Sequence, residues 1–470
     1  MAERIRPEWE AVIGMEVHAQ LATRSKMFCD CSADYLAAAP NSSVCEVCLG
    51  LPGVLPVINQ RAVELVVKTG LALNCDIPAH SKFDRKNYFY PDLPKGYQIS
   101  QYDLPMCARG RFEVDGHVVR ITRVHLEEDT GKLLHAGDAL HTAQESLVDL
   151  NRSGVPLMEI VSEPDMRSAD EARNYTVALR ALLRAIGASE ADMEKGQLRA
   201  EANVSVRPAG GEELGVKTEI KNINSFRALQ RAVGYEIRRQ IEVLEAGGTV
   251  VQETRGWSEA EQRTFSQRSK EYADDYRYFP EPDLPPLELD PAWVEALRAS
   301  LPELPAARRR RFKEQYGISE YDAEQLTAEA ATADLFEATV AEGAPAKQAA
   351  NWIIESQPTL DPVRLAELIN LVVRGTINRD QGLQVLEEAQ SAGRAPAEIV
   401  QERGLAQVSD ESALAEIVER VVADSPQAVA DFKAGKQQAA MALLGKVRAE
   451  TGGTANMSVA RDLLMQRLNR

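Results

Sequence analysis

The sequence has few cysteines, few histidines, few aromatic residues and no long apolar run. Of its 470 residues, 6 are Cys, 6 are His and 6% are aromatic. Its apolar runs, such as 54–58 and 157–161, stop well short of the roughly 20 residues that a membrane-spanning helix needs. The first residues, Met1 to Arg6, lack the apolar core of a signal peptide. We therefore expect a cytoplasmic protein without membrane contact, whose reduced thiols serve as metal ligands or buried side chains.

Positive charge is also scarce, with 54 Lys and Arg against 71 Asp and Glu and a net charge of -17. This balance argues against binding to nucleic acid through the overall electrostatic field. It leaves room for a local basic groove, because a few contacts to phosphates are enough for binding. The hydrophobic share of 44% and the charged share of 27% are typical of a globular protein and exclude a disordered one.

The pattern of strands and helices changes along the chain and predicts an α+β protein of three domains. Short alternating or apolar segments predict strands at 11–21, 111–126, 156–161, 202–206 and 215–223, and helical periodicity covers 168–186 and 225–246. We expect a mostly antiparallel sheet in this part. Prolines gather between positions 280 and 291, and only helical periodicity follows them. The predicted domains are 1–292, an all-helical 293–406 and a small helical tail, 407–470.

Four of the cysteines form two close pairs, Cys29 with Cys31 and Cys45 with Cys48. A tetrahedral zinc ion binds four thiolates, and such a closed site is structural because it leaves no open position for substrate. The spacing therefore predicts a structural zinc site. Four unrelated buried thiols are the alternative interpretation.

Acidic side chains stand at three places that suggest a metal or catalytic role. Alternation along the first strand places Glu16 and His18 on one face, where they could share a divalent ion or simply meet solvent. Glu159 lies in an apolar strand, where a carboxylate must be bound to a metal or paired, for instance with an arginine. The acids of 127–129 follow His125 and could bind magnesium or form a solvated turn.

No known phosphate-binding loop is present, because neither GxxxxGK[ST] nor GxGxxG occurs. The segment 215–225 places Lys217, Glu219 and Lys221 on one strand face. Two lysines around a glutamate could hold phosphates and a metal, although a solvated face is the alternative. The segments 82–98 and 275–283 mix aromatic with charged residues, a combination that suits either phosphate and base stacking or a rigid packed loop.

Together, these segments resemble the GatB family, which provides one subunit of the bacterial aspartyl/glutamyl-tRNA amidotransferase. The matching text is spread over nearly the whole first domain. It comprises Ile13-Gly-Met-Glu-Val-His18, Lys82 to Pro91, His125-Leu-Glu-Glu-Asp129, Pro156 to Asp165, Glu219 to Ser225 and Asp274 to Asp283. The C-terminal region resembles the helical domain and the YqeY-like tail of the family through Gly435-Lys436 and Leu444-Gly-Lys446.

The resemblance implies a cradle-shaped first domain that binds ATP, magnesium and the 3' end of misacylated tRNA. ATP would phosphorylate the side-chain carboxylate of Glu-tRNA(Gln) or Asp-tRNA(Asn), and ammonia would displace the phosphate. Carried over to this chain, Glu16, His18, Glu128 and Glu159 are the expected catalytic and magnesium residues. Lys217 and Lys221 remain an inference from the residues, as contacts to the ATP phosphates. Glu201 replaces an aspartate usual in the family and is left out of the expected site.

The resemblance also implies partners, because no glutaminase signature is present to supply ammonia. The expected assembly is a heterotrimer with an amidase (glutaminase) subunit that supplies ammonia and a small third subunit that ties the two together. A non-discriminating aminoacyl-tRNA synthetase is a further candidate partner. The rival hypothesis is a non-catalytic, zinc-stapled tRNA-binding module, which does not explain an acid inside an apolar strand. A metal hydrolase is less favoured, because just His18 lies in a plausible ligand pattern.

Overall fold

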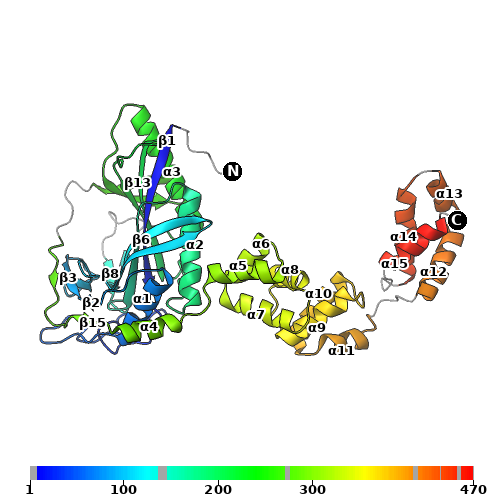
Figure 1. The fold of residues 1–470 in the computed structure, drawn as a ribbon, viewed down its shortest axis with the longest axis horizontal. Helices are drawn as coiled ribbons and strands as arrows, with labels where there is room; N and C mark the ends of the chain where they lie inside the picture. The colour runs from blue at the N-terminus through cyan, green and yellow to red at the C-terminus, as the bar shows by residue number, and fades with distance from the viewer. Residues whose placement is uncertain are drawn as a thin grey trace. The chain divides into compact units, whose positions relative to one another are not determined.

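The computed structural model describes residues 8–135, 146–269, 276–405, 411–434, 436–451 and 457–468. The chain forms two compact units, Met1–Leu304 and Pro305–Arg470 (Figure 1). Within the described residues, no helix combines the length and the apolar character needed to cross a membrane.

An eight-stranded sheet forms the centre of the first unit, in the order β13-β12-β11-β10-β1-β9-β6-β5 (Figure 1). Neighbouring strands are antiparallel except β11 and β12, which are parallel. The central position of β1 brings its side chains between those of β9 and β10. The strands are β1 (Trp9–Gln20), β5 (Cys107–Val114), β6 (His117–Glu128), β9 (Pro156–Ser162), β10 (Leu198–Pro208), β11 (Thr218–Lys221), β12 (Glu253–Ser258) and β13 (Arg263–Ser269).

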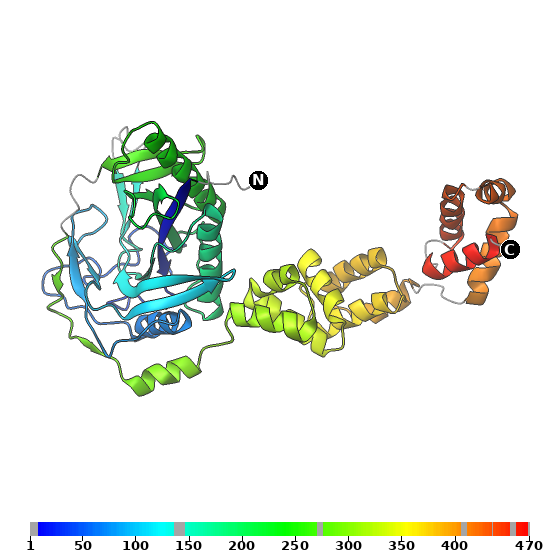
Figure 2. The same cartoon turned by 45° about the horizontal axis from the view of Figure 1, so that its top comes forward.

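Helices α2 (Ala169–Ala185) and α3 (Phe226–Glu245) lie side by side along the sheet (Figures 1 and 2). Each begins at a serine, Ser168 or Ser225, whose hydroxyl accepts a hydrogen bond from a first-turn backbone amide. Their apolar faces belong to the same hydrophobic core as the buried β1 residues Met15 and Val17. Because side chains alternate along a strand, the intervening residues of β1 point to the other face. Helix α1 (Gln60–Ala72) packs against β5 and β6.

Three small sheets complete the first unit and tie distant segments together. The first joins β14 (Phe279–Pro280), β3 (Asp84–Asn87) and β4 (Tyr97–Ser100), the second joins β15 (Leu287–Glu288) and β2 (His80–Ser81), and the third joins β7 (Lys132–His135) and β8 (Ser146–Asp149). Helix α4 (Pro291–Ala299) then packs against α1. The proline-rich segment is therefore paired with the body of this unit rather than extended away from it.

The second unit is helical throughout its described residues and has two separate hydrophobic clusters. The first cluster is formed by α5 (Pro305–Tyr316), α6 (Glu320–Thr327), α7 (Ala330–Ala341), α8 (Ala346–Ser356), α9 (Pro362–Val373), α10 (Arg379–Ala392) and α11 (Pro396–Glu402). The second is formed by α12 (Glu411–Ala423), α13 (Pro426–Lys433), α14 (Gln438–Glu450) and α15 (Met457–Leu468). The domain boundary predicted after residue 406 lies outside the described residues, and the three-domain division stays a prediction.

The predicted fold class is confirmed, and two details differ from the sequence analysis. The segment expected as one strand at 111–126 is a hairpin, because Asp115 and Gly116 have positive φ angles of 50° and 80° and turn the chain. Helix α1 was missed, since its Val66 and Val67 follow Leu65 in an apolar run that gives no clear helical periodicity.

Candidate active site and metal centre

The open face of β1 carries the first predicted site residues. Glu16 and His18 point away from the core, as the alternation predicts, and both are partly exposed. Residues two positions apart on a strand, such as these two, are separated by about 7 Å along the strand axis. Each therefore meets a different set of neighbours.

His18, Glu159 and His125 form a row across three adjacent strands. The strand registers pair Glu159 of β9 with His18 of β1 on one side and with His125 of β6 on the other. The Nε2 atoms of both histidines lie 3.4 Å from Oε2 of Glu159. Arg123 is farther away, with its Nη2 atom 3.9 Å from Oε1 of Glu159. Glu159 is thus buried mainly between two imidazoles, and the arginine pair considered above is its weaker contact.

Glu127 completes this group, which we call the His18 cluster and define as His18, Glu127 and Glu159. Glu127 is 2% exposed and lies 3.8 Å from the Nε2 atom of each histidine. One ligand atom from each of the three residues lies within 4.8 Å of the others. The cluster therefore offers two carboxylates and one imidazole to a single divalent ion.

The electrostatics of the His18 cluster favour a cation. Burial lowers the pKa of His18, but the hydrogen bond to Glu159 and the charges of Glu159 and Glu127 outweigh it and raise this pKa to about 9. Burial opposes ionisation of Glu159, yet the neighbouring histidines hold its pKa well below its ordinary value. The Nδ1 atom of His18 is buried without a hydrogen-bond partner among the described residues. A divalent ion that displaces the proton of His18 would pair with both carboxylates, so the cluster suits a metal ion.

Glu16 belongs to a second group, the Glu16 cluster, which consists of Glu16, Glu201 and Glu219. One carboxylate oxygen from each residue lies within 4.8 Å of the others. Lys221 reaches into this cluster, with its Nζ atom 2.8 Å from Glu201 and 3.3 Å from Glu219. Burial opposes protonation of Lys221, but the two glutamates raise its pKa above the ordinary value. A phosphate or a metal would meet both charge signs here.

Lys217 lies beside the Glu16 cluster, at the edge of a cavity. The cavity has a volume of about 280 Å³ and is lined by Gly14, Glu16, Asn203, Gly215 and Lys217, among others. Asn203 donates a hydrogen bond of 2.7 Å to Glu16. The exposed side chain of Lys217 therefore stands beside a carboxylate whose position is fixed from the neighbouring strand.

Glu128 lies apart from both clusters. Its Oε1 atom accepts a hydrogen bond of 2.9 Å from the backbone N–H of Ile99 and pairs with the ammonium of Lys95. With Lys95 it lines a second cavity, of about 220 Å³, together with Cys29 and Cys48. Consecutive residues on a strand point in opposite directions. Glu127 therefore lies on the same face of β6 as His125, and Glu128 lies on the other face.

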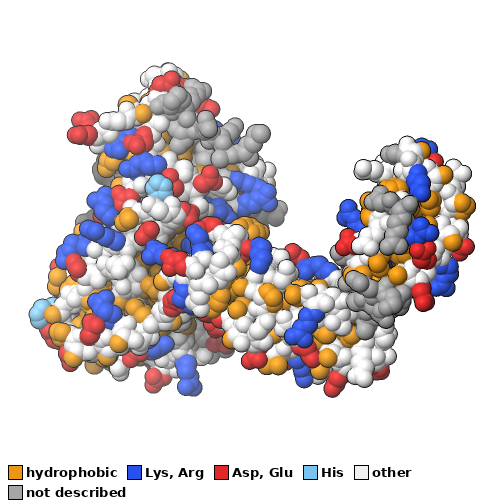
Figure 3. All heavy atoms as spheres, turned by 45° about the vertical axis from the view of Figure 1, so that its right-hand side comes forward, with side chains coloured by type: hydrophobic (Ala, Val, Ile, Leu, Met, Phe, Trp, Pro, Cys, Tyr) orange, Lys and Arg blue, Asp and Glu red, His pale blue; other side chains and the backbone are white. Residues whose placement is uncertain are grey.

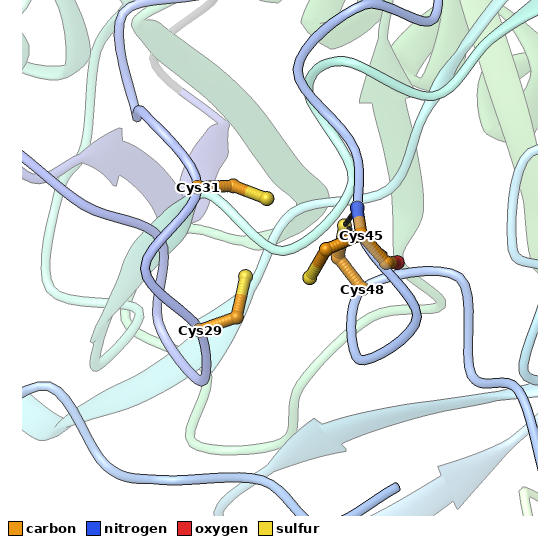
Figure 4. Close-up of side chains that lie close together, drawn as sticks. All are labelled: Cys29, Cys31, Cys45 and Cys48. Atoms are coloured by element: carbon orange, nitrogen blue, oxygen red, sulfur yellow. Dashed lines mark hydrogen bonds between the residues drawn. The ribbon is translucent and has the colours of Figure 1, made fainter.

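The four paired cysteines converge on one point. Two loops carry them, and their sulfur atoms face a common space (Figure 4). All four Sγ atoms lie within 4.8 Å of one another, and the backbone N–H of Cys45 donates to Sγ of Cys48 at 3.1 Å. That hydrogen bond and others, foremost one from Cys29, outweigh burial and lower the pKa of Cys48 to about 4. This group can hold a metal ion, as the sequence predicts. The identity of the metal as zinc stays a prediction.

The structure brings together only part of the predicted set. His18 and Glu159 share one cluster, Glu16 and Lys221 share another, and Glu128 stands alone. The sequence analysis considered Glu127 only as one of the acids 127–129 and did not place it in the expected site. It also left out Glu201, which lies opposite Glu16 in the register of β1 and β10. A period of two from His125 points to Glu127 rather than Glu128, so that signal was available. The approach of Glu201 to Glu16 depends on strand pairing, which no local pattern reveals.

The chain matches two family models and is similar to known proteins over nearly its whole length. Residues 11–295 match the model of the GatB/GatE catalytic domain, and residues 334–468 match that of the GatB domain. The chain is 51% identical to the GatB subunit of the aspartyl/glutamyl-tRNA(Asn/Gln) amidotransferase of Carboxydothermus hydrogenoformans, with 98% of this chain and 99% of that protein covered. It is 54% identical to the same subunit of the Thermomicrobium roseum enzyme, over 98% and 99% of the two chains. The chain belongs to the GatB family, which confirms the resemblance.

Proposed function

We propose that this chain is the subunit of a tRNA-dependent amidotransferase that activates the side-chain carboxylate of misacylated tRNA. In this reaction, ATP phosphorylates the carboxylate of Glu-tRNA(Gln) or Asp-tRNA(Asn), and ammonia replaces the phosphate to give the amide. The observation that carries the proposal is the pair of acidic clusters on the open face of the sheet, in a chain of the GatB family. A module that only binds tRNA has no use for carboxylates buried at this cost.

The two acidic clusters fit magnesium, and one magnesium ion is proposed for each cluster. His18, Glu127 and Glu159 would hold one ion, and Glu16, Glu201 and Glu219 would hold another. Magnesium neutralises charge on the transferred phosphoryl group. The buried carboxylates of Glu127 and Glu159, which both face the Nε2 atom of His18, support this assignment. Glu128 is also kept in the proposed catalytic set. Ile99 and Lys95 fix it in the cavity beside the cysteine group, apart from both clusters.

Lys217 and Lys221 are the proposed contacts to the ATP phosphates. Lys221 is held between Glu201 and Glu219, so its ammonium is fixed beside the proposed metal ligands. Lys217 is exposed at the cavity that Glu16 also lines. In this arrangement both lysines compensate phosphate charge. The backbone of β11 carries Lys221, and Lys217 directly precedes that strand. Positioning and charge compensation are the main tasks of an enzyme that transfers phosphoryl groups.

The cysteine group is proposed to bind a structural zinc ion. Its donor set of four thiolates matches such sites, and it leaves no position for substrate. The group ties two loops beside the cavity that Glu128 and Lys95 line. Zinc would therefore support the local fold next to the site rather than take part in the reaction.

The proposed assembly is a cytoplasmic heterotrimer. An amidase (glutaminase) subunit would supply ammonia, a small third subunit would join the complex, and a non-discriminating aminoacyl-tRNA synthetase is a candidate partner for delivery of the misacylated tRNA. In the view of Figure 3, Lys and Arg side chains are interspersed with Asp and Glu side chains. Together with the net charge of -17, this pattern favours a grip on tRNA through local surfaces.

Reconstitution with the amidase and the small third subunit tests the proposal. The complex is assayed for glutamine-dependent amidation of Glu-tRNA and of Asp-tRNA in separate reactions, each with and without ATP. We expect amide formation on at least one tRNA and only with ATP. A complex that binds both tRNAs but amidates neither would favour the rival binding module.

A further inference from the structure

A lysine is buried directly beside the cysteine group. Lys26 is 1% exposed. Its ammonium donates a hydrogen bond of 2.8 Å to the carbonyl of Ser43 and lies 3.6 Å from Sγ of Cys48. A buried ammonium is costly unless it is paired and hydrogen-bonded. The Ser43 carbonyl and the sulfur of Cys48 are therefore the groups that stabilise this buried ammonium.

The same residue also contacts the other cysteine pair. The backbone N–H of Lys26 donates to the carbonyl of Cys31 at 2.9 Å. Asn59 in turn donates to the Lys26 carbonyl at 3.1 Å, which anchors this part of the chain at the start of α1. Lys26 thus bonds to both loops that supply the four sulfur atoms.

The charges explain why a cation is needed at this place. Four thiolates around one divalent ion carry a net charge of about -2, and such a charge is unfavourable in a buried setting. Throughout the part of the chain that the structure describes, no carboxylate forms an ion pair with Lys26. The sulfur of Cys48 is the acidic group that its ammonium faces. A backbone N–H, from Cys45, already donates to that sulfur, but it brings no full charge.

We propose that Lys26 is the positioning residue of this metal site, acting as its buried counter-charge and as the link between its two loops. The proposal rests on the metal site put forward above. The ammonium stabilises the Cys48 thiolate and offsets part of the negative charge of the loaded site. The backbone amide holds the Cys31 loop in register. Lys26 touches no reacting group, so its effect falls on the metal.

The experiment compares metal binding by the full chain and by the variants Lys26→Met and Lys26→Gln. Lys26→Met keeps the length of the side chain and removes its charge, and Lys26→Gln keeps a hydrogen-bond donor without the charge. Lys68→Met is the matched control, because Lys68 lies on α1 in the same unit and outside the segments 26–31 and 43–48 that form the cysteine group. Zinc affinity is measured by competition with a chromophoric chelator. The cobalt-loaded proteins are compared by their sulfur-to-cobalt charge-transfer bands.

Outer-shell partners of a metal site typically contribute 10- to 100-fold to its affinity. We expect zinc to bind Lys26→Met about 10 to 100 times more weakly, with a shifted charge-transfer band, while Lys68→Met matches the parent. If Lys26→Met does not fold, Lys26→Gln carries the same comparison. Parent-like affinity and spectrum in the folded Lys26 variants would overturn the role of Lys26 and leave the zinc site standing. Absence of zinc or cobalt binding by the parent would overturn the metal site itself.

Discussion

Replacement of Glu159 by Gln is the sharpest perturbation of the proposed site. Gln keeps the size and shape of the side chain, but it removes the charge that faces His18 and His125. Burial lowers the pKa of His18, but the hydrogen bond to Glu159 and the negative field of Glu159, Glu127 and Glu201 raise it from 6.5 to about 9. At about 1.4 kcal/mol per pKa unit, this displacement corresponds to about 3 kcal/mol. The same field acts on a bound cation.

We therefore expect Glu159→Gln to lower the rate of amidation by up to about 100-fold, since 3 kcal/mol is about two powers of ten and Glu159 makes the largest favourable contribution to this shift. The affinity for tRNA should change by less than about threefold, because buried residues such as Glu159 do not meet phosphates. Glu113→Gln is the matched control, as Glu113 is an exposed glutamate on β5.

The assay uses the reconstituted complex under single-turnover conditions, with tRNA affinity measured in parallel by filter binding. Unchanged turnover in Glu159→Gln would refute the electrostatic reasoning. Equal losses of turnover and tRNA binding would refute the assignment of Glu159 to chemistry, and would favour the binding-module interpretation.

Three other predictions concern the same chain. In magnesium-free buffer, the raised pKa of His18 stabilises the folded state fully below about pH 6.5, and this contribution is lost as the pH rises through about 9. Denaturant titrations should therefore show that the free energy of unfolding falls over this pH range, and His18→Asn should abolish the fall. Lys217→Met should raise the KM for ATP about tenfold or more, since a hydrogen bond to a charged group contributes about 1.5 kcal/mol or more, with little change in the KM for tRNA. An unaltered KM for ATP would remove Lys217 from the site. Truncation after Leu405 should weaken tRNA binding and leave ATP hydrolysis intact, and undiminished tRNA affinity would exclude the tail as a binding surface.

Much of the fold could be predicted because the alternation in the strands is local. The faces of β1 were correct: Met15 and Val17 are buried, and Glu16 and His18 point the other way. The break at Asp115 and Gly116 was also readable in principle, since this pair is a turn signal. Helix α1 was missed because its consecutive apolar residues are equally compatible with a buried strand.

The site was less predictable, because its two clusters depend on strand pairing. Glu16 and His18 share a face, but the rise of about 3.3 Å per residue separates them. Glu159 of β9 and Glu127 of β6 complete the His18 cluster, whereas Glu201 of β10 and Glu219 of β11 complete the Glu16 cluster. Glu219 comes from β11, which meets β10 through just three paired positions. The pairing of these strands leaves no trace in the local sequence. The cysteine site was predictable, since the spacing within each pair already limits how its sulfurs can meet.

The role of the clusters in carboxylate activation is tested most directly by a reaction that bypasses the glutaminase. The reconstituted complex is given misacylated tRNA, ammonium chloride and ATP labelled in the γ-phosphate, and both amide and labelled phosphate are followed. We predict that they form in equal amounts in the parent complex, and that both are lost together in Glu159→Gln. Amide formation without phosphate release, or at the parent rate in Glu159→Gln, would contradict the proposed function of this site.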